Sequence, residues 1–359
     1  MNAPLATAAS LLTGSVDLAA AVPGGLTVRS AIAALGAFAA ALVLGPFAIR
    51  WLKGRFREPI KSASATLNAL HAAKHGTPTM GGLFVVAATV IATLLCGELS
   101  NSHVRIGLAA VVSFAALGAV DDWVKLRSSR RGLSGRQKFV VQTLLGVGLA
   151  SWLLTTRAGP AVAQAGAVEL LSGPMWVLWG TIVIVGSSNG VNLTDGLDGL
   201  AAGSVVFAGT AVAALTYVAG HSEFAAYLGV PYVAGCGELT VLLGGVVGSV
   251  LGFLWYNAYP AKVFLGDTGS LPLGAILGVA ALAARQELLL IIIGGVFVVE
   301  TLSVILQVGC YKLTGRRVLA CSPLHNHFIF RGQHEVTVVT RFWIIAALLA
   351  IAGLAAMKL

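Results

Sequence analysis

Long apolar stretches recur along the whole chain and are separated by short polar segments. A helix needs about 20 apolar residues to cross the hydrocarbon core of a bilayer, and only elements that satisfy their own backbone hydrogen bonds are stable there. The pattern predicts ten membrane-spanning helices near residues 31–51, 80–97, 104–121, 138–155, 174–190, 197–219, 237–257, 269–284, 288–310 and 342–358. The stretch 269–284 is the shortest, and we expect it to be tilted or half-buried.

The basic residues are unevenly divided between the two sides that ten crossings create. With the first loop placed in the cytoplasm, 18 of the 23 Lys and Arg residues fall on the cytoplasmic side. Such an excess on one side is typical of membrane proteins, whose cytoplasmic loops carry most of the basic residues. The sequence therefore predicts a multi-pass membrane protein with both termini on the outer side. The longest polar loops, about 52–79, 121–137 and 311–341, are predicted to be cytoplasmic.

Composition supports a membrane protein and excludes several other classes. The chain is 57% apolar and only 10% charged, whereas soluble domains carry about 25% charged residues. High apolarity opposes disorder, and four cysteines are too few for a disulfide scaffold. We predict a single integral-membrane domain over residues 1–359, surrounded by membrane lipids. We assign the net charge of +9 to topology and to a surface for lipid or phosphate groups, not to nucleic acid.

Three glycines four residues apart mark one face of the seventh predicted span. Gly244, Gly248 and Gly252 form a small-x-x-x-small pattern. This pattern is typical of helices that approach a neighbour closely in lipid. We interpret it as a packing feature.

Acidic residues carry the strongest functional signal. Five of the six aspartates fall on the predicted cytoplasmic side, at span ends or in short loops: Asp121, Asp122, Asp195, Asp198 and Asp267. Ionisable groups near a membrane are costly and usually functional, although any one of them could be a helix cap or a solvated loop residue. Asp121 and Asp122 are adjacent and would point about 100° apart on a helix, which favours different roles. Asp195 and Asp198 are three apart and are expected to share a helix face.

The residue types in these motifs favour a hard cation and a phosphorylated substrate. Carboxylates without cysteine ligands or an obvious histidine trio are typical of Mg²⁺, which also binds substrate phosphates. In the segment 323–328, His325 and His327 are expected to point toward one ligand from an extended stretch, with Asn326 facing the other way. The two histidines could bind a metal or contact a diphosphate or sugar.

Five segments together resemble a known family. They are Lys74–Gly82 (KHGTPTMGG), Asp121–Asp122, Asn192–Leu200 (NLTDGLDGL), Phe264–Gly269 (FLGDTG) and Pro323–Phe328 (PLHNHF). Over essentially the whole chain, the sequence resembles the phospho-N-acetylmuramoyl-pentapeptide transferases of the polyprenyl-phosphate N-acetylhexosamine-1-phosphate transferase superfamily. The resemblance implies an all-α protein of about ten spans in the bacterial inner membrane, with both termini on the periplasmic side and the active site on the cytoplasmic face. It also implies that UDP-N-acetylmuramoyl-pentapeptide and undecaprenyl phosphate react, with Mg²⁺, to give lipid I and UMP, the first membrane step of peptidoglycan synthesis.

The resemblance also implies roles for individual residues. Asp267 is expected to be the Mg²⁺ ligand, and Asp121 and Asp122 are expected at the catalytic centre, one of them as the base for the lipid phosphate. Substrate contacts are expected at Lys74, Thr79, Lys125, Asn192, Asp195, Asp198, Asn257, Phe264, His325 and His327. Within this set Asn192, Asp195 and Asp198 would border the nucleotide, and Asn257 and Phe264 would lie near the uracil. Lys138 is a weaker candidate, and a homodimer is a further expectation.

Two departures from the family pattern and two alternatives bear on this interpretation. Asn326 stands where the family usually has the second of three successive histidines, and the Asp-Gly-Pro that usually precedes the His71 region is absent. One alternative is a sister transferase that takes UDP-N-acetylglucosamine. The other is an ion-coupled transporter, in which carboxylates near mid-span and repeated halves would be expected.

Overall fold

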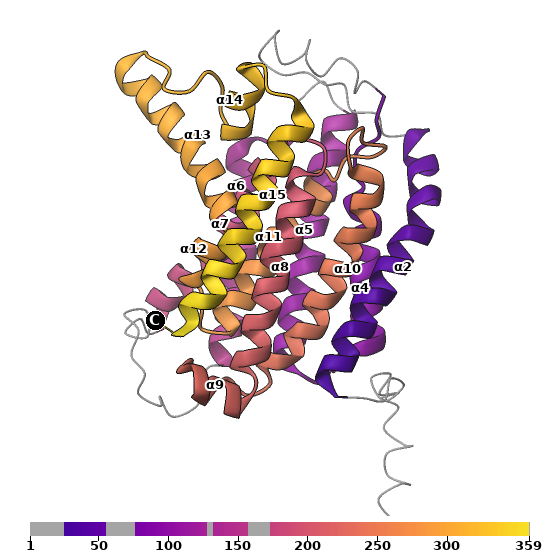
Figure 1. The fold of residues 1–359 in the computed structure, drawn as a ribbon, viewed down its shortest axis with the longest axis vertical. Coiled ribbons are helices and arrows are strands. Elements are labelled where there is room, and N and C mark those ends of the chain that lie inside the picture. Colours follow the sequence, from indigo (N-terminus) through magenta and orange to yellow (C-terminus); the bar gives the residue numbers. More distant parts are fainter. Residues whose placement is uncertain (1–24, 55–75, 128–131, 157–172, 359) are drawn as a thin grey trace, which may run out of the picture.

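Helices joined by turns and short loops make up the described chain (Figure 1). The computed structural model describes residues 25–54, 76–127, 132–156 and 173–358. The longer helices are α2 (Leu26–Lys53), α4 (Gly82–Cys96), α5 (Ser102–Arg127), α6 (Gly135–Thr155), α7 (Pro174–Thr194), α8 (Leu200–Ala219), α10 (Leu239–Asn257), α11 (Asp267–Ala283), α13 (Gly295–Thr314) and α15 (Glu335–Ala355). The shorter ones are α9 (Ser222–Leu228), α12 (Leu289–Ile293), α14 (Leu324–Phe330) and the 3-10 turns η3 (Cys236–Glu238) and η4 (Ala356–Lys358).

Each predicted span coincides with helical structure, which confirms the all-α expectation. Within the described ranges, seven helices are long and apolar enough to cross a membrane: α2, α5, α6, α8, α10 with η3, α13, and α15 with η4. The helices α4 and α11 are apolar but shorter. The span predicted at 288–310 is interrupted at Gly294, where α12 ends and α13 begins. The number of crossings and the side on which each terminus lies stay predictions.

The short helix α11 lies in the middle of the bundle. All 17 of its residues are buried, and it contacts α5, α7 and α8. Of the two alternatives expected for residues 269–284, half-burial is therefore wrong, and a tilt relative to the membrane stays a prediction. Because neighbouring helices cover α11 on every side, the helix presents no face to lipid and its apolar side chains form the centre of the core.

Peripheral helices carry the opposite pattern, with aliphatic side chains turned outward. Leu35 on α2, Leu144 on α6, Ile305 on α13 and Ile351 on α15 are all 59–70% exposed. An outward belt of large apolar side chains is stable in lipid rather than in water. In Figure 1, α13 leans away from the bundle at the end where α14 lies, while α9 lies at the opposite end.

The predicted glycine face of α10 packs against α2, as expected. A Cβ atom on Gly248 would overlap the carbonyl oxygen of Ala34, and one on Gly252 would stand 2.8 Å from the carbonyl oxygen of Phe38. These backbones approach so closely because neither glycine has a side chain.

Candidate active site

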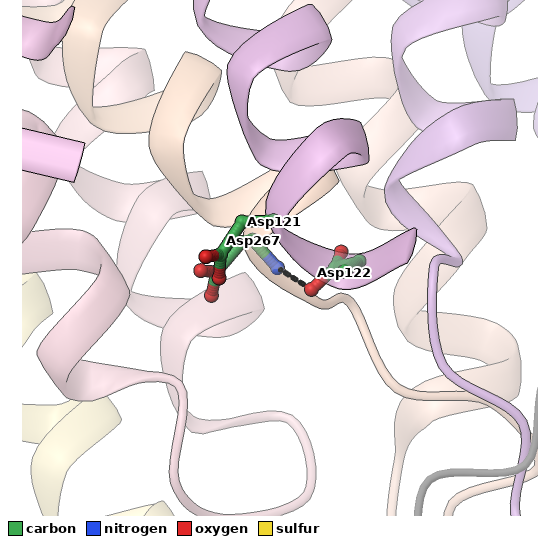
Figure 2. Close-up of side chains that lie close together, drawn as sticks. All are labelled: Asp121, Asp122 and Asp267. Atoms are coloured by element: carbon green, nitrogen blue, oxygen red, sulfur yellow. Dashed lines mark hydrogen bonds between the residues drawn. The ribbon is translucent and has the colours of Figure 1, made fainter. Parts of the chain in front are cut away.

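Three aspartates from two helices meet at one end of the bundle. Asp121 and Asp122 lie near the end of α5, and Asp267 is the first residue of α11. One carboxylate oxygen from each lies within 4.8 Å of the other two, and all three residues are buried. Figure 2 shows the carboxylates of Asp121 and Asp267 turned to the same side, whereas the Asp122 carboxylate lies apart and accepts a hydrogen bond from the Asp267 amide. Aspartates distant in sequence thus form one carboxylate cluster.

Two glycines allow the helices to approach closely enough for this cluster. A Cβ atom on Gly118, on α5, would overlap the carbonyl oxygen of Asp267 and stand 2.6 Å from the amide nitrogen of Thr268. Gly266 precedes α11 with φ +73°, a backbone region that other residues rarely adopt. A Cβ atom at Gly266 would stand 2.6 Å from the Oδ2 atom of Asp122. Any side chain at either position would force the aspartates apart.

Asp122 serves as a cap for α11. Its Oδ2 atom accepts hydrogen bonds from the backbone amide and the hydroxyl of Thr268, at 2.9 and 2.7 Å. Its Oδ1 atom accepts one from the amide of Asp267 at 3.2 Å. The first N–H groups of a helix lack partners within the helix and attract a carboxylate. Asp122 therefore orients Asp267, and its own oxygens are already occupied.

Two lysines neutralise most of the negative charge in the cluster. The Nζ atom of Lys125 lies 2.8 Å from Asp121 Oδ2, 3.0 Å from Asp267 Oδ2 and 3.3 Å from Asp122 Oδ1. The Nζ atom of Lys138, on α6, lies 2.6 Å from Asp267 Oδ2. Buried carboxylates need such partners because desolvation of an unpaired charge is costly. Three ionised carboxylates and two ammonium groups leave one net negative charge. Lys138, the weaker candidate in the sequence, contacts the cluster directly.

Asn192 connects α7 to the same cluster. Its side-chain amide donates to Asp267 Oδ1 at 2.7 Å and to the hydroxyl of Ser270 at 2.8 Å. Its Oδ1 atom accepts from Lys138 Nζ at 3.3 Å. The described structure thus places the Asn192 side chain against the carboxylates. Its expected contact with the nucleotide stays a prediction.

The chemistry of the cluster fits a divalent cation. Mg²⁺ prefers oxygen ligands and is usually held by one or two carboxylates together with substrate phosphates. Asp121 and Asp267 direct their carboxylates to the side where the lysine ammonium groups lie. These are the residues that could hold the cation.

The expectation that Asp195 and Asp198 share a helix face is wrong. Helix α7 ends at Thr194, and residues 195–199 form a turn before α8, with Gly199 at φ +79°. Asp198 is buried in this turn and accepts a hydrogen bond from the amide of Ala261 at 2.9 Å, whereas Asp195 is half-buried. Gly199 directly precedes α8 and takes a left-handed conformation that costs glycine no steric strain.

Asn257 holds two loops together near the cluster. It is the last residue of α10, where it accepts from the amide of Gly199 and donates to the carbonyl of Val263, both at 2.9 Å. The side chain is buried. Its contacts in the described structure are therefore with the protein backbone, and the expected proximity to uracil stays a prediction.

The segment around Phe264 lies beside the segment that contains Thr79. The backbone amide of Phe264 donates to the carbonyl of Pro78, and its carbonyl accepts from the amide of Gly81, both at 2.8 Å. Thr79 is buried, and its hydroxyl has no hydrogen-bond partner within the described part of the chain. Two of the resembling motifs thus pair through their backbones. Lys74 lies outside the described residues.

The expectation that His325 and His327 point toward one ligand is also wrong. Residues 324–330 form helix α14, on which side chains two positions apart point about 200° from each other. His327 accepts from the amide of Ala320 at 3.1 Å, while His325 is buried and pairs with Glu300 of α13. The sequence interpretation did not include Glu300. Its only signal was position, as the one acidic residue within the apolar stretch 288–310.

Comparison with known proteins identifies the family of this chain. The family model described as glycosyl transferase family 4 matches residues 104–285, a range that contains all three cluster aspartates. This match defines the class of the protein as a transferase whose family region lies in the helical bundle. Over 343 residues the chain is 45% identical to the phospho-N-acetylmuramoyl-pentapeptide-transferase of Granulibacter bethesdensis, covering 93% of this chain and 94% of that protein. The chain therefore belongs to the phospho-N-acetylmuramoyl-pentapeptide-transferase family.

Proposed function

We propose that the chain transfers phospho-N-acetylmuramoyl-pentapeptide from UDP-N-acetylmuramoyl-pentapeptide to undecaprenyl phosphate, giving lipid I and UMP. The relationship to a transferase of that name over nearly the whole length supports this reaction. The observation that carries the chemistry is the carboxylate cluster with its two lysines at the end of the bundle. Phosphoryl transfer depends on charge neutralisation and positioning more than on covalent chemistry by the protein, and this cluster offers both.

Mg²⁺ is part of the proposal, with Asp267 as its ligand. When bound, the cation neutralises charge on the donor diphosphate and polarises it for attack. Lys125 and Lys138 both contact Asp267 Oδ2, so their ammonium groups lie where they could also bind the donor phosphates. The same positive charges would then stabilise the departing UMP.

Asp121 is our candidate for the base. The Asp122 oxygens cap the N-terminus of α11, whereas the Asp121 carboxylate is turned to the same side as that of Asp267 and forms an ion pair with Lys125. In the proposed step Asp121 accepts the proton of the lipid phosphate. An oxygen of that phosphate then bonds to the phosphorus next to the sugar, and the bond from this phosphorus to the bridging oxygen breaks to release UMP.

We further propose the inner membrane as the location, with the site on the cytoplasmic face. The bias of 18 in 23 basic residues supports this orientation. One substrate is soluble and the other is a lipid, so their reaction requires a site at the membrane surface. Carboxylates at the ends of α5 and α11 favour a transferase over an ion-coupled transporter, whose ion ligands would lie near mid-span.

The test is a transfer assay with purified protein, undecaprenyl phosphate and Mg²⁺, in which the lipid product and UMP are both measured. We expect turnover with UDP-N-acetylmuramoyl-pentapeptide and little with UDP-N-acetylglucosamine. Asp267→Asn should lose about a thousandfold in turnover, because an amide is a poor Mg²⁺ ligand. Glu98→Gln removes the same charge from an exposed loop and is the matched control.

Three results would contradict the proposal. Preference for the smaller donor would move the protein to the sister transferases. Near-normal turnover of Asp267→Asn at limiting Mg²⁺ would remove Asp267 as the ligand. Absence of transfer with either donor, from folded wild-type protein, would overturn the function itself.

A further inference from the structure

A buried glutamate and a buried histidine form a pair between α13 and α14. Glu300 is 0% exposed and His325 is 1% exposed. The Oε2 atom of Glu300 lies 3.1 Å from the Nδ1 atom of the His325 ring, and its Oε1 atom accepts the His325 backbone amide at 3.1 Å. Both oxygens of one carboxylate thus hold the same residue, through its ring and through its backbone. This arrangement leaves the imidazole little freedom to rotate.

The second nitrogen of the ring is left without a partner. The Nε2 atom of His325 is buried and has no hydrogen bond to any residue in the described ranges. It faces Gly196, where a Cβ atom would overlap Nε2 and stand 2.7 Å from the ring atom Cε1. Buried polar atoms are almost always hydrogen-bonded, so an orphan of this kind needs an explanation. Stability alone does not explain the pair either, because two apolar side chains could join α13 and α14 without the cost of burying a charge.

The position of Nε2 relates it to the carboxylate cluster. Gly196 belongs to the turn 195–199, which directly follows α7. Asn192, in the last turn of α7, donates to Asp267. The orphan nitrogen therefore lies against the segment that leads from the cluster, and a substrate that contacts this turn comes close to it.

The chemistry of the pair explains how the glutamate would act. A carboxylate facing Nδ1 favours the form of imidazole with its proton on Nδ1. Nε2 is then free to accept a hydrogen bond in the neutral ring, or to donate one in the protonated ring. A carboxylate behind a histidine fixes ring orientation in the same way at metal sites, and its loss there typically costs about 10–100-fold in affinity or activity.

We propose that Glu300 is a positioning residue that holds the His325 ring with Nε2 beside Gly196. When the donor binds at the turn 195–199, Nε2 contacts an oxygen of its sugar-phosphate part. This inference rests on the proposed function and extends it to a residue outside the carboxylate cluster. Gly196 is also required for this arrangement, because only a residue without a side chain leaves room for the His325 ring.

The experiment measures kcat and the KM of each substrate, together with the melting temperature, for six variants, which include His325→Ala and the double variant Glu300→Gln/His325→Ala. Glu300→Gln removes the charge, and Glu300→Asp retains it. Gly196→Ala adds a methyl group against Nε2 while leaving both partners in place, and its backbone φ is not in the left-handed region. Glu238→Gln is the matched control, because Glu238 forms an ion pair with Arg29 at the start of α10 and not at the cluster.

We expect Glu300→Gln and Gly196→Ala each to lower kcat/KM for the UDP donor by about 10–100-fold, with KM for the lipid acceptor unchanged. Glu300→Asp should recover part of the loss, and Glu238→Gln should behave as wild type. The double variant Glu300→Gln/His325→Ala should be no worse than His325→Ala, because Glu300 acts through the ring. Selective ¹⁵N labelling of histidine should show the tautomer signal of His325 redistributed in Glu300→Gln.

Each of the following outcomes overturns the inference. Wild-type kcat/KM in Glu300→Gln, or in folded Gly196→Ala, would show that the ring contacts no substrate. Additive losses in the double variant would show that Glu300 acts independently of His325. A lower melting temperature together with the same loss of activity toward both substrates would indicate a structural pair only. All three results require an active wild-type enzyme, so they are distinguishable from failure of the proposed function.

Discussion

Gly118→Ala perturbs the active site without removing any functional group. The added methyl group would meet the first turn of α11, 2.6 Å from the amide nitrogen of Thr268 and closer still to the carbonyl oxygen of Asp267. Ordinary van der Waals contact for such an atom begins at 3.4 Å. The start of α11, with Asp267, must therefore move away from α5 by at least 0.8 Å, the difference between these two distances.

The size of this shift determines the expected effect on rate. A misplacement of about 1 Å at reacting groups can cost about 100-fold, which corresponds to about 2.7 kcal/mol of activation free energy. Overpacking a tightly packed interface costs about 1–3 kcal/mol of stability as well. We expect turnover to fall by about 100-fold in a protein that still folds, because moving the start of α11 away from α5 displaces Asp267 and lengthens the hydrogen bonds that Asp122 accepts from the α11 amides.

The assay compares Gly118→Ala with Gly148→Ala in the transfer reaction and in thermal unfolding. Gly148, on α6, is the matched glycine control, because a methyl group added there would have no atom of another residue within 4 Å. Its turnover should stay within about twofold of wild type, as for most substitutions without steric conflict. Equal turnover of the two variants would refute the reasoning, since the cluster geometry would then not depend on the approach of α5 to α11.

Two further predictions concern the cation and the topology. Lys138→Met should strengthen Mg²⁺ binding in calorimetry while lowering turnover, because its ammonium group lies 2.6 Å from Asp267 and competes with the cation; weaker Mg²⁺ binding would contradict this competition. An impermeant thiol reagent should label Cys321 only after cells are permeabilised, with Cys321→Ser as control, and should label Ser102→Cys in intact cells. Burial raises the pKa of the Cys321 thiol, so less of the reactive thiolate is present at neutral pH. The labelling is therefore best run at a pH above neutral. Labelling of Cys321 from outside would contradict both the predicted loop orientation and the placement of the site.

The helices and the family could be predicted from the sequence because both depend on local information. A stretch of about 20 apolar residues has few stable alternatives to a helix in lipid, whatever the rest of the chain does. Each of the ten apolar stretches is helical for this reason. The motifs around Asp121, Asp267 and His325 likewise identify the family through residues close together in the sequence.

Local pattern failed where a turn or a short helix depends on distant contacts. The segment 323–328 contains no periodicity that distinguishes an extended stretch from α14, and the structure that forms there presents His325 to Glu300 of another helix. The spacing of Asp195 and Asp198 predicts one helix face. The turn 195–199 is instead held by two hydrogen bonds, one from the Gly199 amide to Asn257 and one that Asp198 accepts from the Ala261 amide. Such contacts are made by residues about 60 positions away, which no local pattern records.

The arrangement of the active site was decided only by tertiary structure. The sequence determined that aspartates stand at the ends of predicted helices, and that Gly118 lies one turn before Asp121. It did not determine that Asp122 caps α11, or that Asp267 lies between two lysines from α5 and α6. Helix formation in a membrane follows from hydropathy along a single segment, whereas the distances between carboxylates follow from how closely two helices pack. That closeness depends on small residues such as Gly118 facing the right neighbour, and the neighbour is chosen by the fold as a whole.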